Sequence, residues 1–279
     1  LNLQNVTVVS RDEFEDSELL KAKANRNAKE YIWTCKPSTA VYVLQNYKLD
    51  SCTYIEADLY FYSSSKVLFE EAKDHSVIIT DHRYSPEYDQ SARSGKYAAQ
   101  FIYFKKNKEG LEAANNWRKD CNEWCYDRFE ENKYGDQKYL ESWAARFSGV
   151  HDLQHLGGGV GPWNMQQYAF HKENDEFIGT ERKTGKSFHL VFVHFHNIRF
   201  FERYIDYSTY KLSRQIKKNL FRPYLKHLLS ISKDIQKQFP DFEINYNATS
   251  SNGRSGIELI RHIFARYRKG LYNFMFYKN

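Results

Sequence analysis

The pattern of hydrophobic and polar residues along the chain predicts an alternation of strands and helices. Short apolar runs rich in β-branched and aromatic residues predict strands, whereas apolar residues spaced three or four positions apart predict helices. The predicted strands span residues 5–10, 54–62, 76–80, 97–104 and 188–196, with a hairpin between 176 and 186. The predicted helices span residues 11–18, 21–29, 37–47, 68–73 and 110–126, and another opens at 135–140. This alternation predicts an α/β sheet with its site at the strand ends.

From residue 200 onward the pattern is helical. Residues 211–232 and 257–269 have the spacing of helices, separated by a break at Phe239-Pro240. Asn252-Gly253, in a serine-rich stretch, indicates a turn or mobile loop. We therefore predict an α/β domain over residues 1–200 and a basic helical extension over 201–279.

Charge is distributed unevenly between these two parts. The segment from Arg199 to the end has 16 Lys and Arg residues against 6 Asp and Glu, about +10, which leaves the first 198 residues near −4 of the total of +6. A basic segment attracts a nucleic acid or the anionic face of a membrane. The predicted C-terminal helices could therefore lie on an anionic bilayer; the alternative is a solvated helical face that packs by its apolar stripe.

Length, apolar runs, cysteines and aromatic content limit the classes of protein to which the chain could belong. The 279 residues suffice for a full core, and no apolar run approaches the roughly 20 residues of a membrane span. No basic-then-apolar leader is visible, and the four cysteines lack CxxC spacing, so we expect buried thiols in a reducing cytoplasm. Cys121 and Cys125, one helical turn apart, leave a zinc site as an alternative. Aromatic residues make up 17% of the chain, which suits both glycan stacking and a core.

Two carboxylates lie within the predicted strand 54–62. Glu56 and Asp58 are two positions apart, and such residues point to the same side of an extended backbone. They could then share one divalent cation, which accepts carboxylate oxygens and leaves positions for substrate phosphates. This is the arrangement of a DxD motif, with Glu in the first place. The alternative is a pair of solvated turn residues.

Histidines supply further candidate ligands. His194 and His196 share one side of the predicted strand 188–196, and a neutral imidazole can bind manganese beside carboxylates. The alternative for a strand histidine is a satisfied core residue. His155 precedes the glycine-rich turn 156–164, in which Gly158 and its neighbours would let backbone N–H groups approach a diphosphate. A tight turn without a ligand explains those glycines equally well.

Several short motifs together resemble those of a known family. They are Trp33-Thr34-Cys35-Lys36-Pro37-Ser38, Glu56-Ala57-Asp58-Leu59-Tyr60-Phe61, Gly135-Asp136-Gln137, Pro162-Trp163-Asn164 and His194-Phe195-His196. In this order they are similar to motifs of bacterial GT-A glycosyltransferases, in particular the glycogenin-like family (family eight) of retaining nucleotide-sugar transferases. The resemblance covers roughly residues 1–200 and implies a GT-A-like, Rossmann-like sheet with helices on both faces. The family's first strand and helix have no counterpart here, and we expect them to precede this sequence.

The resemblance also implies roles for particular residues. Glu56 and Asp58 match the acids that hold manganese, and His194 matches a late histidine ligand. The Asp-Gln pair near the sugar corresponds to Asp136 and Gln137, and a Trp-Asn pair corresponds to Trp163 and Asn164. The chain departs from the family's pattern at Glu56, Ala98, Gln100, Asn197 and Arg199.

These observations predict a Mn²⁺-dependent (or Mg²⁺-dependent) glycosyltransferase. It would move a sugar from a nucleotide diphosphate sugar, UDP-linked by the resemblance, to a glycan or lipid-linked acceptor in surface polysaccharide biosynthesis. Retention of configuration is implied by the resemblance alone. Asp136 would orient a hydroxyl near the anomeric carbon, with a helix N-cap as its alternative role. The residues expected around the donor are Trp33, Thr34, Lys36, His82, Arg83, His155, Gly158, Trp163, Asn164, His196 and Arg199.

Two other classes of protein remain as alternatives. A catalytically silent glycan-binding protein could use the same scaffold, because a fold does not secure a function. A basic nucleic-acid-binding module would suit the charged tail and the aromatic residues. The sequence, however, has no helix-turn-helix or RNP pattern, and this function would leave the carboxylates and His194 unexplained. We therefore expect no nucleic-acid partner. We expect a cytoplasmic protein, with peripheral contact at the inner face of the membrane as a hypothesis.

Overall fold

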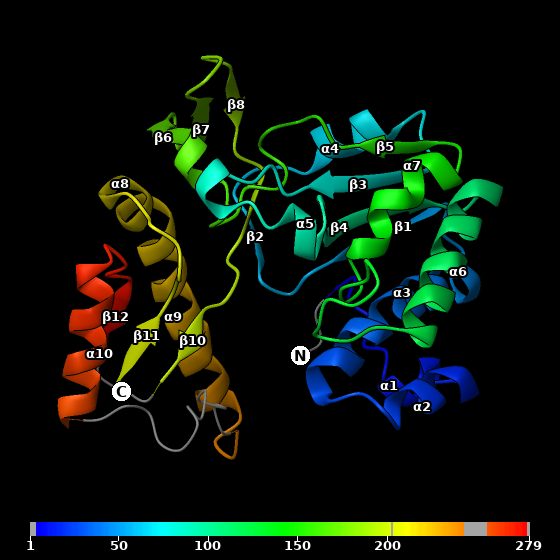
Figure 1. The fold of residues 1–279 in the computed structure, drawn as a ribbon, viewed down its shortest axis with the longest axis horizontal. Coiled ribbons are helices and arrows are strands. Elements are labelled where there is room, and N and C mark those ends of the chain that lie inside the picture. The colour runs from blue at the N-terminus through cyan, green and yellow to red at the C-terminus, as the bar shows by residue number, and fades with distance from the viewer. Residues whose placement is uncertain (1–3, 202, 243–255, 278–279) are drawn as a thin grey trace. The chain divides into compact units, whose positions relative to one another are not determined.

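The computed structural model describes residues 4–201, 203–242 and 256–277 and has a mixed α/β fold with several sheets (Figure 1). It forms two compact units. Unit 1 comprises the chain up to Ala57, Ser65–Tyr84 and Asp89–His155, and unit 2 comprises Asp58–Ser64, Ser85–Tyr88 and the chain from Leu156 onward. The turn predicted at Asn252-Gly253 lies outside the described residues.

A four-stranded mixed sheet forms the centre of unit 1. Its strands are β1 (Ser51–Ile55), β3 (Val77–Asp81), β4 (Tyr97–Lys105) and β5 (Val150–Asp152), in the order β1-β4-β3-β5. The β3–β5 pair is parallel, and the other two pairs are antiparallel. The strands predicted at 76–80 and 97–104 are thereby confirmed, because each is a mainly apolar run that is buried along nearly its whole length.

Helices cover both faces of this sheet. Helices α3 (Ala28–Asn46) and α6 (Lys108–Glu123) pack on one face through a core that contains Leu44, Trp117 and Phe104. Helix α4 (Lys66–Ala72) packs on the other face, where the ring of Phe69 lies 6.0 Å from that of Phe101. The remaining helices of unit 1 are α1 (Arg11–Phe14), α2 (Ser17–Lys23), α5 (Ser91–Ser94) and α7 (Trp143–Arg146), with a 3₁₀ turn at Lys138–Ser142.

A bulge in β4 changes the face to which its residues point. Ile78 pairs with Tyr103, but Thr80, two residues later, pairs with Ala98, so β4 contains additional residues between these pairs. Tyr97 and Ala99 therefore face the same core as Ile102 and Phe104, although the strand alternates. The threonine hydroxyl in the bulge is satisfied, because Thr80 donates to the carbonyl oxygen of Phe101 at 3.0 Å.

The predicted strand 54–62 is two strands in the structure. Strand β1 ends at Ile55 and β2 (Leu59–Phe61) begins after a turn at Ala57 and Asp58. The chain changes partners here: the amide of Glu56 donates to the carbonyl of Gln100 on β4, whereas the carbonyl of Asp58 accepts from the amide of Phe195. The premise that Glu56 and Asp58 point to one side of an extended strand is therefore wrong.

The described residues of unit 2 form three small sheets and the C-terminal helices. Strand β2 pairs antiparallel with β9 (Phe192–His194). The second sheet has the order β6-β7-β8, with β6 (Tyr168–Glu173), β7 (Glu176–Glu181) and β8 (Ser187–His189), which includes the predicted hairpin. The third has the order β10-β11-β12, with β10 (Arg199–Phe200), β11 (Tyr204–Asp206) and β12 (Phe274–Phe276). The helices are α8 (Arg214–Ile216), a π-helical turn at Lys217–Phe221, α9 (Arg222–Gln238) and α10 (Gly256–Arg268), with a 3₁₀ turn at Pro86–Tyr88 and another at Met165–Gln167.

One core joins the strands before residue 200 to the helices after it. The ring of Phe195, directly after β9, stacks on that of Tyr224 in α9 at 3.8 Å, and both belong to a cluster that also contains Val160 and Phe188. The compact units accordingly divide near residue 155, so that residues on both sides of position 200 belong to one unit.

Several local predictions need correction. Residues 6–10 form no strand, and the predicted strand 188–196 is interrupted at Leu190 and Val191, whose amides donate to the carbonyls of Phe177 and Gly157 instead. The C-terminal part is not purely helical, since it contributes the β10-β11-β12 sheet. Helix α9 ends at Gln238 and α10 spans Gly256–Arg268, as the break at Phe239-Pro240 and the second periodic stretch predicted.

All four cysteines are free thiols. Cys121 and Cys125 are buried, as predicted, whereas Cys35 and Cys52 are only half-buried. Along the described parts of the chain, no helix combines the length and the apolar character needed to cross a membrane.

Candidate metal centre

Three side chains of unit 2 converge as candidate metal ligands. Asp58, His194 and His196 each offer one ligand atom, and these atoms all lie within 4.8 Å of one another. His194 Nε2 lies 2.9 Å from Asp58 Oδ1. His194 is buried, Asp58 is half-buried and His196 is exposed, so the group is reached from solvent on one side.

The pairing of β2 with β9 brings these residues together. Leu59 is the register partner of His194, so Asp58 directly precedes the residue that faces the histidine. The amide of His194 in turn donates to the carbonyl of Val160 at 2.8 Å, which fixes the other edge of β9. Two segments about 135 residues apart in the sequence are thereby held in one short ladder.

A tight turn places His196 beside His194. Asn197 has φ +65°, a left-handed conformation that glycine and asparagine adopt most readily. The resemblance expects glycine at this position, and asparagine is the side chain that replaces it with least strain. The departure at Asn197 is therefore compatible with the turn.

The ring of Trp163 forms a wall against both histidines. Its centroid lies 5.3 Å from that of His194, nearly perpendicular to it, and 5.9 Å from that of His196. Gly161 allows this position, because a Cβ atom there would approach the Trp163 ring to 2.6 Å. Asn164 closes the same turn: its Oδ1 accepts from the amide of Gly161 at 3.0 Å, and its Nδ2 donates to the carbonyl of Gly159 at 2.9 Å.

The electrostatics of the group favour an ionised carboxylate. Burial would raise the pKa of Asp58, but the hydrogen bond to His194 and the nearby His196 outweigh burial and lower this pKa. Two imidazole nitrogens and one carboxylate oxygen are ligands for first-row divalent metals such as Mn²⁺, Fe²⁺, Co²⁺ or Zn²⁺. Mg²⁺ prefers oxygen ligands, so the donor set fits Mn²⁺ better than Mg²⁺.

The first acid of the motif belongs to a different cluster, in unit 1. The ammonium of Lys36 forms ion pairs with Glu56 and with Asp136, the latter at 2.9 Å. Burial would lower the pKa of Lys36, but the two carboxylates outweigh it and raise this pKa well above its ordinary value. Burial also raises the pKa of Asp136, and Lys36 opposes that shift. The sequence predicted Glu56 as a metal ligand; in the structure its carboxylate binds an ammonium of the protein itself.

Asp136 and Gln137 contribute to the packing of unit 1. Asp136 is buried, and its carbonyl accepts from the indole N–H of Trp117 at 2.8 Å. Gln137 donates to the carbonyl of Ser94 at 2.7 Å and is the N-cap residue of the 3₁₀ turn Lys138–Ser142. The alternative role of Asp136 as a helix N-cap is therefore wrong, since Gln137 has that position.

The other residues expected around a donor make local contacts within their own units. On α3, the Thr34 hydroxyl donates to the carbonyl of Glu30 at 2.8 Å, and the Trp33 ring lies against Gly135. His82 lies 3.0 Å through Nδ1 from the carbonyl of Lys96 and stacks on Tyr84.

Four further predicted residues are also accommodated within their own units. Arg83 donates to the carbonyls of Leu153 and His155, and the amide of His155 donates to Glu71. Gly158 is buried in the glycine turn of unit 2, and Arg199 donates to Asn197 Oδ1 at 3.2 Å.

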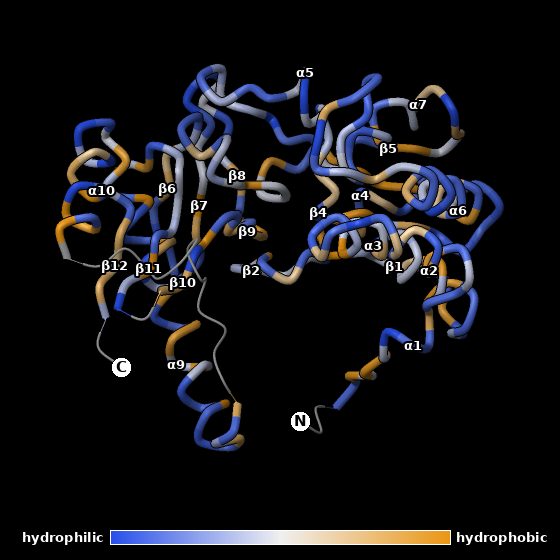
Figure 2. Tube along the Cα trace, turned by 60° about the horizontal axis from the view of Figure 1, so that its bottom comes forward, coloured by the Kyte–Doolittle hydropathy of each residue, from blue (hydrophilic) through white to orange (hydrophobic). Residues whose placement is uncertain are grey.

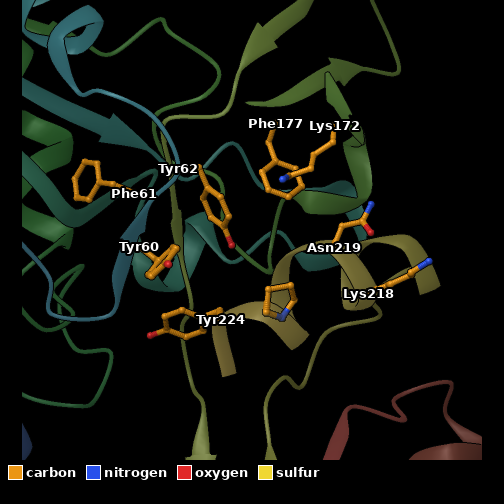
Figure 3. Close-up of a pocket in the computed structure, with 9 residues that line it drawn as sticks. Tyr60, Phe61, Tyr62, Lys172, Phe177, Lys218, Asn219 and Tyr224 are labelled. Carbon is orange, nitrogen blue, oxygen red and sulfur yellow. The ribbon is translucent and has the colours of Figure 1, made fainter. Parts of the chain in front are cut away.

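A recess of about 490 Å³ opens along strand β2 in unit 2 (Figure 3). Its lining is mainly aromatic, with two lysines and one asparagine at its border: Tyr60, Phe61, Tyr62, Lys172, Phe177, Lys218, Asn219, Pro223 and Tyr224. The Tyr60 hydroxyl lies 3.0 Å from His227 Nδ1, whereas the buried Tyr62 hydroxyl has no hydrogen-bond partner among the described residues. The sequence did not predict this recess. Its one indication was the alternation of Tyr60 and Tyr62, which places two aromatic rings on the same side of a strand.

Comparison with known proteins shows relatives but no described activity. No protein-family model matches the chain. YfnD of Bacillus subtilis (strain 168) is 33% identical over 255 residues, which cover 86% of this chain and 77% of YfnD, and YfnF of the same organism is 28% identical over 87% of this chain and 82% of YfnF. Both relatives are described as uncharacterized proteins. From its identity to YfnD and the extent of the match, the chain belongs to the YfnD family.

Proposed function

We propose that this protein is a metal-dependent glycosyltransferase that moves a sugar from a nucleotide diphosphate sugar to a glycan or lipid-linked acceptor. One observation carries the proposal: Asp58 of the Glu-Ala-Asp motif and His194 of the His-Phe-His motif meet at 2.9 Å. The resemblance had assigned both residues to one metal site, although they lie about 135 positions apart in the sequence. The GT-A-like architecture is part of the same proposal, supported by the mixed sheet of unit 1 with helices on both faces.

The metal would bind to Asp58, His194 and His196. A divalent ion there would neutralise the two phosphates of the donor and stabilise the departing nucleotide diphosphate. Asp58 and His194 would both contact the ion directly, and the indole of Trp163 would exclude water from the buried side of the site. Mn²⁺ is the ion that the resemblance implies, and two imidazoles with one carboxylate can bind it, although the same ligands also suit Fe²⁺, Co²⁺ and Zn²⁺.

The aromatic recess along β2 is our candidate for the acceptor. Tyr60 lies two residues after Asp58, so the recess and the ligand triad share one strand and its preceding turn. Aromatic rings stack on the apolar faces of sugars, while Lys218 and Asn219 offer donors for hydroxyl or phosphate groups. Asp136 has a different role in this proposal: its buried carboxylate positions Lys36 instead of contacting the sugar.

The test is nucleotide diphosphate release from a panel of nucleotide sugars, with and without Mn²⁺. We expect release that requires the metal and is lost in Asp58→Asn, together with a loss of Mn²⁺ affinity of more than ~100-fold by calorimetry, since a direct ligand should cost more than an outer-shell partner. Asp175→Asn is the matched control, because Asp175 is a fully exposed acid in the β6–β7 hairpin of the same unit.

Two results would overturn the proposal. Tight Mn²⁺ binding without turnover of any nucleotide sugar would favour the silent glycan-binding protein. Turnover that persists in Asp58→Asn, or Mn²⁺ binding that does not distinguish Asp58→Asn from Asp175→Asn, would remove the triad from the mechanism.

A further inference from the structure

Helix α10 has two apolar faces, and unit 2 covers one of them. Leu259 and Ile263 pack against a small cluster of buried aromatic residues, Phe201, Tyr204 and Phe274. On the same side, Arg266 forms a two-point ion pair with Asp206 at 3.0 and 3.1 Å, with both side chains nearly buried. These contacts fix the rotation of α10 about its own axis and therefore determine which side chains point to solvent.

The second face, which adjoins the first around the helix, presents a stripe of large apolar side chains to solvent. The residues of this stripe, which we call the outer stripe, follow one another at spacings of three, four and three, so they lie on one side of the helix. Their exposed fractions are 68% for Ile257, 67% for Ile260, 60% for Phe264 and 65% for Tyr267. Figure 2 shows hydrophobic residues recurring along α10 between polar ones. Single exposed apolar residues need no explanation, but a contiguous group of this kind marks an interaction surface.

Basic residues border the outer stripe. At about 100° per residue, Arg261 and Arg268 lie within roughly 40° of Ile257 around the helix, and both are exposed. The helix has three arginines and a single acid, Glu258, in its first turn. Apolar and aromatic side chains flanked by arginine are the signature of a helix that lies in the plane of a membrane interface.

The charge of the bordering arginines favours an anionic membrane over a second copy of the chain as the partner of the outer stripe. A symmetric dimer through the outer stripe would place the same surface on both sides, so the bordering arginines of one copy would face those of the other. The phosphates of an anionic bilayer offer the opposite charge over the whole length of the helix. With 13 residues, α10 is shorter than the roughly 20 needed to span a bilayer, so it would lie along the surface.

We propose that the outer stripe of α10 binds the surface of an anionic lipid bilayer. The four apolar side chains enter the boundary between headgroups and acyl chains, and Arg261 and Arg268 contact lipid phosphates. Arg266 and Asp206 hold the helix on its unit during binding. This inference does not depend on the proposed enzymatic activity, since it rests on the exposed face alone.

Co-sedimentation of the full chain with vesicles tests this surface. Phosphatidylcholine vesicles with and without phosphatidylglycerol are compared at low and physiological ionic strength. We expect binding to the anionic vesicles only. The double variant Ile260→Ser/Phe264→Ser should lower the partition coefficient by about tenfold or more, through lost apolar burial. Arg261→Gln/Arg268→Gln should lower it by about fivefold per arginine at low salt, with a smaller effect as salt is raised.

Ile32→Ser is the matched control, because Ile32 on α3 in unit 1 is 64% exposed. Circular dichroism melts establish whether each variant is folded. If the serine variant is not folded, the arginine variant serves as the test of vesicle binding. Absence of binding to anionic vesicles overturns the proposal, as does a serine variant that binds no more weakly than Ile32→Ser. A dimer seen by light scattering that the serine variant dissociates, without vesicle binding, would assign the stripe to a second copy instead.

Discussion

The two acids of the Glu56-Ala57-Asp58 segment are stabilised in different ways, one in each unit. Glu56 forms an ion pair with the ammonium of Lys36, which also binds the buried carboxylate of Asp136. Asp58 lies against the imidazole of His194, with a ligand atom of His196 within 4.8 Å. A single residue, Ala57, separates the two acids in the sequence.

The difference lies in the nature of the partner. An ammonium is a cation that belongs to the protein, so the Lys36 cluster carries its own neutralising charge and contributes to the fold. A neutral imidazole offers a lone pair, so the His194 cluster can bind a cation from outside. Glu56 thus contributes to the stability of unit 1, whereas Asp58, in our proposal, binds a metal ion in unit 2.

The most severe test of the comparison is Lys36→Met. We expect it to lower the free energy of unfolding by about 3–5 kcal/mol, because it leaves the buried Asp136 and the half-buried Glu56 without their cation. Urea unfolding followed by circular dichroism measures this loss. Lys29→Met, which removes the exposed pair of Lys29 with Asp127, should cost less than ~1 kcal/mol.

A second change reveals whether the loss comes from uncompensated charge. The double variant Lys36→Met/Asp136→Asn removes the cation and one carboxylate together, and it should recover part of the stability that Lys36→Met loses. Equal losses for Lys36→Met and Lys29→Met would show that the Lys36 cluster is no different from a surface ion pair.

A smaller effect is expected at the support of the His194 cluster. Gly161→Ala would place a Cβ atom 2.6 Å from the ring of Trp163, which packs on His194, so the ring must shift. We expect a loss of about 1–3 kcal/mol in the free energy of unfolding, together with weaker Mn²⁺ binding. Denaturant unfolding and calorimetry measure the two effects.

Gly185→Ala separates backbone strain from steric overlap. Gly185 has φ +75°, but a Cβ atom there would meet nothing within 4 Å. Its replacement should cost roughly 1–2 kcal/mol through the left-handed backbone alone and leave Mn²⁺ affinity unchanged. If both alanine variants change Mn²⁺ affinity equally, Trp163 does not support the ligands.

The smallest effect concerns a carboxylate held mainly by backbone donors. Glu71 on α4 accepts from the amides of Gln154 and His155 and lies 2.8 Å from His151 Nε2. Burial would raise the pKa of Glu71, but these hydrogen bonds outweigh it and lower this pKa. Because the folded-state pKa is lowered, the stabilisation is complete above the ordinary value of about 4.3 and is lost as pH falls through the folded-state pKa.

The pH dependence of Glu71→Gln measures this contribution. The difference in unfolding free energy between wild type and Glu71→Gln should be constant near neutrality and should shrink as the solution becomes acidic. Glu70→Gln, at an exposed neighbour that pairs only loosely with Lys66, should give a difference that varies little with pH. A constant difference for Glu71→Gln over the acidic range would contradict the assigned hydrogen bonds.

Local sequence patterns predicted the elements that are buried or amphipathic throughout. Strands β3 and β4 are mainly apolar runs that are buried on both faces, and helix α6 has one amphipathic pattern along its length. The structure forms all three within a few residues of the predicted ranges. The strand predicted at 54–62 failed because its pattern continues through Ala57 while its hydrogen-bond partner changes from β4 to β9. No local pattern records such a change of partner.

The candidate site shows the same limit at the level of side chains. The sequence identified Asp58 and His194 as ligands, with His196 nearby, because each residue type is chemically suited to a metal. It also assigned Glu56 to that metal, since spacing in an extended strand was the available geometry. In the structure Glu56 pairs instead with Lys36, which the sequence had placed among the residues around the donor.

What the sequence determined by itself is the inventory: an α/β alternation, a basic C-terminal part, and a set of acids, histidines and aromatic residues suited to a metal and a sugar. Tertiary structure alone decided which of them meet. Register between β2 and β9 joins Asp58 to His194, the turn at Ala57 sends Glu56 to Lys36, and the ion pair of Arg266 with Asp206 exposes the outer stripe of α10. The physical reason is that composition and periodicity act over a few residues, whereas these contacts join segments about 20 to 135 positions apart.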